Sequence, residues 1–134
     1  MSFVVDCSVA ARWLLPDEAT ACTDAVLDLL NMQDAVVPAP FLSEFANVFL
    51  KLSRQHKLTQ ALALGAVQQF EALGLEVDHS TPDPERLFSL ATLYGLSAYD
   101  ASYLELALRR GLPLACRDGG LQQAAEIAGL YLTA

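Results

Sequence analysis

Apolar residues recur along this chain with two alternating spacings. Short continuous runs such as Phe3–Val5 and Ala35–Val37 are typical of strands buried on both faces. Longer stretches repeat every three or four residues, as in Phe41, Phe45, Val48 and Leu52, and predict amphipathic helices. The predicted strands are 3–5, 35–37, 74–77, 114–116 and, as a possible fifth, 130–132. The predicted helices are a short one ending near 13, then 17–31, 41–52, 58–73, 84–94, 98–110 and 118–128.

Strands that alternate with helices indicate βαβ units. We therefore expect an α/β fold in which a small parallel sheet of four or five strands is flanked by helices on both faces. The 134 residues suffice for one domain, so residues 1–134 are expected to form a single domain.

In such a sheet the ligand crevice lies beyond the carboxyl ends of the strands. Three acids follow predicted strands there: Asp6 directly after the first, Glu44 one turn after the second, and Asp118 after the fourth. Each also has an ordinary explanation, because acids favour helix N-termini as caps or through the helix dipole. Position alone leaves these alternatives open.

Asp100 is more informative because it projects from an apolar side of its helix, between Leu104 and Ala107 on a helical wheel. A cap formed with Ser97 explains where the helix starts but not the apolar flank, where an unpaired carboxylate is costly. The opposite side, with Glu105 and Arg109, is expected to face solvent.

Four carboxylates in one crevice would repel each other unless divalent cations neutralised them. Mg²⁺ and Mn²⁺ prefer oxygen ligands and support phosphodiester hydrolysis. Such a site also accounts for part of the net charge of -8, which otherwise argues against a nucleic-acid ligand. The three cysteines have no zinc-site spacing and are expected to be small core residues.

The beginning of the chain lacks a signal-peptide pattern, and no apolar run is long enough to span a membrane. A cytoplasmic protein with no membrane partner is therefore expected.

Four short motifs resemble, in order and spacing, those of PIN-domain ribonucleases. They are Val4–Val9, Ser43-Glu44, Tyr99–Ala101 and Cys116–Asp118. The run Leu-Pro-Asp-Glu after the first motif looks like the VapC toxins of toxin–antitoxin pairs.

The resemblance implies a Mg²⁺- or Mn²⁺-dependent endoribonuclease that acts as a type II toxin. It also implies a homodimer and a cognate antitoxin with a basic tail that lies across the site. Carried over to this chain, it makes Asp6, Glu44, Asp100 and Asp118 the catalytic, metal-binding acids, with Ser8 as a hydroxyl beside the first.

One position departs from the family pattern: Cys116 stands where Thr or Ser is usual, two residues before the last acid. A thiol is a weak hydrogen-bond donor, so Cys116 is a poorer support for that acid. This departure keeps open a second hypothesis, a catalytically weak binding module that works in a complex with its antitoxin.

Two arginines near the acids, Arg12 and Arg117, are candidate contacts to RNA phosphates. A third hypothesis, a phosphoryl-transfer domain of the receiver or dehalogenase type, would also place Asp6 after the first strand. It requires a late catalytic lysine, whereas the last lysine here is Lys57.

Overall fold

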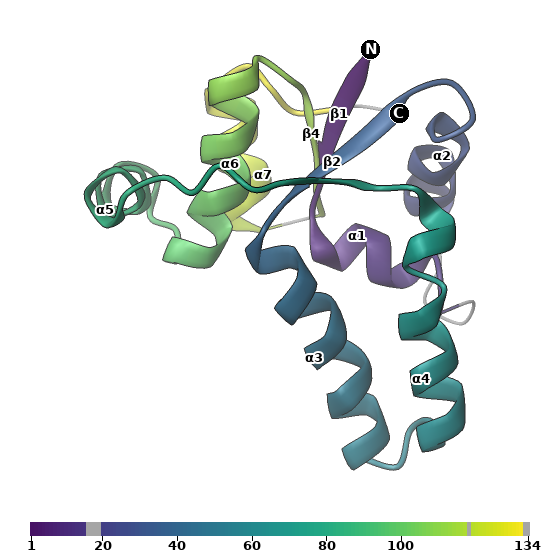
Figure 1. Cartoon of the computed structure of the whole chain (residues 1–134). Coiled ribbons are helices and arrows are strands. Elements are labelled where there is room, and N and C mark those ends of the chain that lie inside the picture. The colour runs from purple at the N-terminus through teal and green to yellow at the C-terminus, as the bar shows by residue number, and fades with distance from the viewer. Residues whose placement is uncertain (16–19, 118, 133–134) are drawn as a thin grey trace.

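The sheet has four parallel strands in the order β3-β2-β1-β4. Figure 1 labels β1, β2 and β4. This computed structural model describes residues 1–15, 20–117 and 119–132. The strands are β1 (Ser2–Val5), β2 (Asp34–Pro38), β3 (Glu76–Asp78) and β4 (Leu114–Ala115). β1 and β2 lie in the middle, and their core residues are fully buried, as the unbroken apolar runs predict.

Helices cover both faces of the sheet. The helices are α1 (Cys7–Arg12), α2 (Ala21–Leu29), α3 (Pro40–Arg54), α4 (Gln60–Gln68), α5 (Pro84–Tyr94), α6 (Ala98–Arg110) and α7 (Gly120–Ile127). Helix α6 packs against β1, β2 and β4, with α5 and α7 beside it, while α1 and α2 lie on the other side (Figure 1). The predicted α/β/α architecture is confirmed.

Several boundaries differ from those predicted. The helix predicted over 58–73 ends at Gln68 and is followed by a 3-10 turn, which closes at Gly74 in the left-handed conformation (φ 67°). β3 therefore begins at Glu76, two residues later than predicted. Of the possible fifth strand, Tyr131 forms an isolated parallel bridge to Leu114. The first residues of the helix predicted to start at Asp17 lie outside the described part of the chain.

Capping residues fix the helix starts that position the candidate acids. Asp6 caps α1 by accepting a hydrogen bond from the Val9 backbone N–H at 3.0 Å. Ser97 caps α6 in the same way, through the Asp100 N–H at 3.1 Å. Both helices therefore begin at the carboxyl edge of the sheet.

The expectation that Glu105 faces solvent is wrong. Helix α6 lies between the sheet and α5, so Glu105 is only 5% exposed. Arg109 compensates the buried charge by donating hydrogen bonds to Glu105 from Nε at 2.8 Å and from Nη2 at 3.2 Å. Nη1 and Nη2 also donate to the two oxygens of Asp78, both at 3.2 Å. The cluster joins the central helix to the edge strand β3.

None of the helices described here is both long enough and apolar enough to cross a bilayer.

Replacing Arg109 by Ala should destabilise the fold, because Glu105 would remain buried and charged without a partner. We expect a loss of about 2 kcal/mol in the free energy of unfolding, moderated by the partial exposure of the guanidinium. The matched control is Arg110→Ala. Its main partner Glu76 is half exposed, and its contact with Asp78 is long at 3.5 Å, so the change should cost less than about 1 kcal/mol. Urea denaturation of both variants measures the difference, and equal losses would contradict the special role of Arg109.

Candidate active site

Three of the four predicted acids converge at the carboxyl edge of the sheet. Asp6 ends β1, Glu44 lies in the second turn of α3 directly after β2, and Asp100 lies in the first turn of α6. The charge of Asp100 acts on both Asp6 and Glu44, and that of Asp6 acts on Glu44. The three carboxylates are therefore near enough to influence one another's charge. Asp118, the fourth predicted acid, lies outside the described residues.

Asp6 combines the two roles that the sequence left open as alternatives. Its carboxylate caps α1 and also accepts a hydrogen bond from Ser8 Oγ, at 2.9 Å from both oxygens. Burial nevertheless raises the pKa of Asp6 to about 6, and the charge of Asp100 adds to this effect. The two hydrogen bonds and the Arg117 guanidinium act in the opposite direction without cancelling it.

Glu44 is also held in an environment that disfavours its charged form. Burial, together with the charges of Asp100 and Asp6, raises the pKa of Glu44 to about 7. Burial also raises the pKa of Asp100. At neutral pH the fold thus holds negative charge where both desolvation and like charges oppose it.

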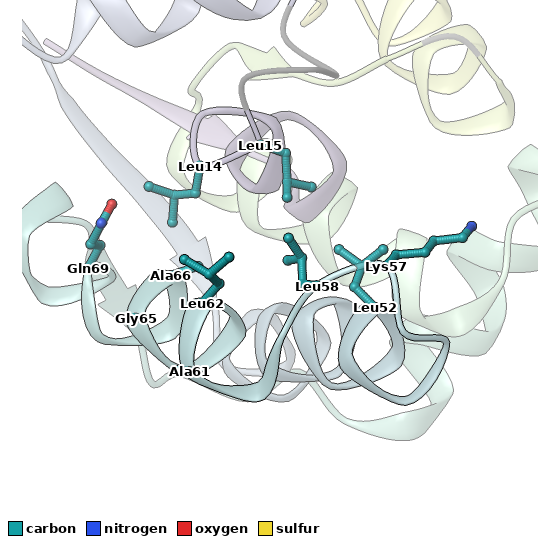
Figure 2. Close-up of a pocket in the computed structure, with 10 residues that line it drawn as sticks. All are labelled: Leu14, Leu15, Leu52, Lys57, Leu58, Ala61, Leu62, Gly65, Ala66 and Gln69. Atoms are coloured by element: carbon teal, nitrogen blue, oxygen red, sulfur yellow. The ribbon is translucent and has the colours of Figure 1, made fainter.

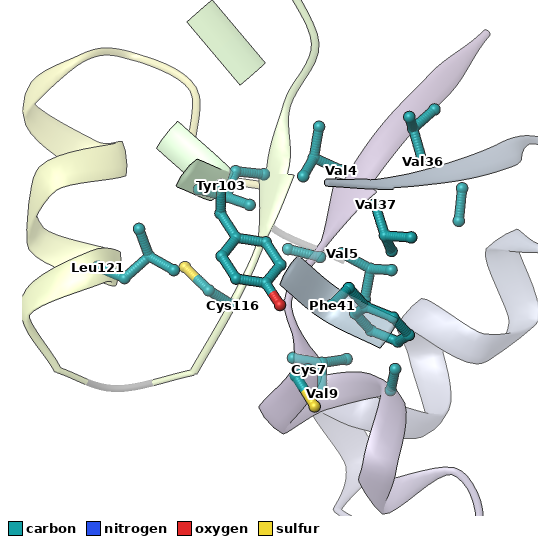
Figure 3. Close-up of a cluster of buried hydrophobic side chains, with 14 of the residues drawn as sticks. Val4, Val5, Cys7, Val9, Val36, Val37, Phe41, Tyr103, Cys116 and Leu121 are labelled. Carbon is teal, nitrogen blue, oxygen red and sulfur yellow. The ribbon is translucent and has the colours of Figure 1, made fainter. Parts of the chain in front are cut away.

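Tyr103 was not among the predicted site residues. It is 1% exposed and reaches from α6 toward the end of β1 and the start of α1, close to Cys7 in Figure 3. Its hydroxyl is near enough to Glu44 to lower the pKa of that carboxyl. Yet within the described residues neither Tyr103 Oη nor Glu44 Oε1, both buried, has a partner in hydrogen-bond geometry. The spacing of three from Asp100, which places both side chains on one helix face, could have indicated Tyr103.

The two thiols beside the acids remain neutral. Burial raises the pKa of Cys7 and of Cys116 to about 12, and neighbouring carboxylates contribute to each shift. Both side chains are nearly inaccessible, at 5% and 3% exposure, as predicted for small core residues. Cys22, by contrast, is exposed, so the same prediction is wrong for it.

The two predicted arginines differ in their surroundings. Arg117 lies close enough to Asp6 to lower the pKa of that carboxyl. Arg12 donates a hydrogen bond to the Ser8 backbone carbonyl at 3.1 Å, within α1. Contact of either residue with RNA stays a prediction.

An apolar cavity of about 450 Å³ lies apart from the acids (Figure 2). It is formed by the chain after α1 and by the α3–α4 hairpin, with Leu14, Leu15 and Leu58 among its lining residues. Of the described residues that line it, none is an acid, so this cavity is not the centre of the proposed chemistry.

Comparison with known families identifies the fold and its class. The model of the PIN domain family matches residues 3–127. The chain belongs to the PIN domain family. PIN domains are generally nucleases, and they typically use divalent metal ions.

A solved structure similar to this PIN domain is that of PAE2754 from Pyrobaculum aerophilum. The match has a TM-score of 0.72 at 20% sequence identity and covers 92% of this chain and 84% of the other. At that identity the likeness concerns the fold. Comparison with curated proteins gave no significant match.

The donor atoms of this PIN domain fit a hard divalent cation. Asp6, Glu44 and Asp100 offer carboxylate oxygens, and the buried Glu44 Oε1 has no partner among the described residues. In residues 1–15, 20–117 and 119–132, however, no group of three or more His, Cys, Asp or Glu is arranged to hold a metal ion. The assignment of these acids as metal ligands stays a prediction.

Replacing Asp6 by Asn should stabilise the protein at pH 8. Because the folded pKa of Asp6 lies above its ordinary value of 3.8, the folded state loses stability as pH rises through about 4 to 6. Asn removes this penalty while still capping α1, so the gain should be on the order of 1–3 kcal/mol above pH 6 and vanish below pH 4.

Asp78→Asn is the control of opposite sign. Burial acts to raise the pKa of Asp78, but hydrogen bonds from Arg109 and the Ser80 N–H outweigh it and lower the pKa. Removing that charge should destabilise the fold at neutral pH and matter less as pH falls. Denaturation curves from pH 2 to 8 test both signs, because the loss caused by Asp78→Asn fades only as the pH falls below the ordinary value of 3.8. A destabilised Asp6→Asn protein at pH 8 would contradict the burial of unfavourable charge.

Proposed function

We propose that this PIN domain is a Mg²⁺- or Mn²⁺-dependent endoribonuclease that acts as the toxin of a type II toxin–antitoxin pair. The observation that carries the proposal is the convergence of Asp6, Glu44 and Asp100, three like charges that the fold partly buries in one place. Perturbed carboxylates in a crevice are typical of functional sites. Hydrolysis of phosphodiester bonds is the chemistry that such an oxygen-rich, metal-binding site serves.

The chain's own residues would hold the cation and fix its position. Asp6, Glu44 and Asp100 would supply ligands, together with Asp118, which lies outside the described residues. Ser8 and the Val9 N–H hold the Asp6 carboxylate in one orientation through three contacts of 2.9 to 3.0 Å. When bound, the cation would stabilise charge on the attacked phosphate and make water a nucleophile at neutral pH.

The partners of the proposed toxin follow from its charge and its surface. A net charge of -8 favours a basic partner, in keeping with an antitoxin whose basic tail covers the acids. Phe88 and Leu93 of α5 are 73% and 74% exposed, and such apolar surface supports association into a homodimer. We place the toxin and its antitoxin in the cytoplasm, together with the proposed RNA substrate.

Asp6→Asn and Asp100→Asn should each abolish RNA cleavage in Mg²⁺ or Mn²⁺, because each removes a charged ligand and leaves the fold intact. We expect a loss of at least about a hundredfold in the initial rate on total RNA. Asp83→Asn is a matched control, since Asp83 caps α5 as Asp6 caps α1 but belongs to an exposed helix start. If both site variants cleaved as fast as the control, the site assignment would be wrong.

The toxin role predicts growth arrest. Induced alone in a bacterial host, the parent chain should stop growth and degrade a defined set of RNAs, whereas Asp6→Asn at equal protein level should do neither. Growth curves together with RNA electrophoresis make the comparison. Cleavage in vitro without arrest in vivo would leave a nuclease but rule out the toxin role in that host.

A further inference from the structure

A second hollow adjoins the acids, between α3 and the start of α6. It is an open cleft of about 460 Å³ lined by Ser43, Glu44, Asn47 and Tyr99. Ser43 and Asn47 are four residues apart and lie on one side of α3. Tyr99 stands opposite them, in the first turn of α6, with 69% of its surface exposed.

The cleft is continuous with the candidate active site. Glu44 lines the cleft and is also coupled electrostatically to Asp6 and Asp100. Tyr99 directly precedes Asp100, and the Ser97 cap fixes the turn that carries both. A group bound in the cleft would therefore lie beside Glu44 and close to the start of α6, which carries Asp100.

The residues that line the cleft indicate which kind of chemical group would bind there. Tyr99 offers an aromatic face, while the Ser43 hydroxyl and the Asn47 amide can donate and accept hydrogen bonds. Of the described lining residues none is basic, and Glu44 would repel a phosphate. An uncharged, planar heterocycle with donors and acceptors on its edge matches all three properties.

We propose that this cleft is a base-binding subsite, in which Tyr99 stacks on an unpaired nucleobase of single-stranded RNA and Asn47 and Ser43 contact its edge. The proposal rests on the proposed nuclease function and extends it to substrate specificity. Base stacking is open to unpaired nucleotides, whose faces and edges are free, and it requires no positive charge. It thus gives an acidic protein a way to hold RNA that phosphate contacts cannot supply.

Binding of a fluorescently labelled single-stranded RNA, followed by anisotropy, tests the subsite without cleavage. All proteins carry Asp6→Asn, so the RNA stays intact. Tyr99→Ala should weaken binding about tenfold, whereas Tyr99→Phe, which keeps the ring, should bind within about twofold of the parent. Ile127→Ala is the control, because Ile127 is an exposed apolar residue (77%) at the end of α7 and is not part of the cleft lining.

Two further readouts separate stacking from other roles. The loss caused by Tyr99→Ala should be the same at 50 and 200 mM salt, because stacking releases no counterions. In the cleavage-competent chain, Asn47→Ala should change the base preferred beside the cut, read by sequencing the product ends, while cleavage continues.

The subsite is overturned if Tyr99→Ala binds RNA as tightly as Ile127→Ala does. It is also overturned if Tyr99→Ala leaves the RNA affinity unchanged but alters the molar mass in light scattering, since Tyr99 would then belong to a protein interface. Metal-dependent cleavage by the parent chain is measured separately, so loss of the subsite and loss of the nuclease function remain distinguishable.

Discussion

The rest of this structure depends on one constraint. Carboxylates of like charge are held near one another and partly out of water, although both burial and repulsion disfavour their charged forms. Asp6, Glu44 and Asp100 come from three elements that start or end at the same sheet edge, and each has a raised pKa. The burial of β1 and β2 and the caps at Asp6 and Ser97 keep them there. A fold selected for stability alone would not retain such a cluster, whereas a cation-binding site requires one.

A buried acid that stabilises the fold has different surroundings from the acids of the site. Glu105 is buried, and Arg109 donates hydrogen bonds to both of its oxygens and links it to Asp78. Glu105, paired on one side of α6, belongs to the part of the helix that stabilises the fold, whereas Asp100, whose pKa burial raises, lies in the part that serves the site. Tyr103, directed from the same helix toward Glu44, belongs with the site.

Local patterns predicted the architecture well because apolar runs, caps and terminating glycines are local signals; Asp83 and Gly95 bound α5 as expected. Predictions that depended on tertiary packing were less accurate. Glu105 was assigned to solvent because a helical wheel cannot show that α5 covers that side. For the same reason a helical wheel does not show that Tyr103 lies near Glu44, because Glu44 belongs to another helix. The convergence of the acids was predictable because parallel strands bring their carboxyl ends to one edge.

The most direct test is titration of the free protein with Mn²⁺ by calorimetry at pH 8, beside the Asp6→Asn and Asp83→Asn variants. The account predicts that the parent and Asp83→Asn bind Mn²⁺ and that Asp6→Asn binds it at least tenfold more weakly. It also predicts that the parent binds less tightly at pH 6, because protons then occupy Glu44 and part of Asp6. A parent chain that binds no Mn²⁺ at either pH would contradict the metal site and favour the binding-module hypothesis.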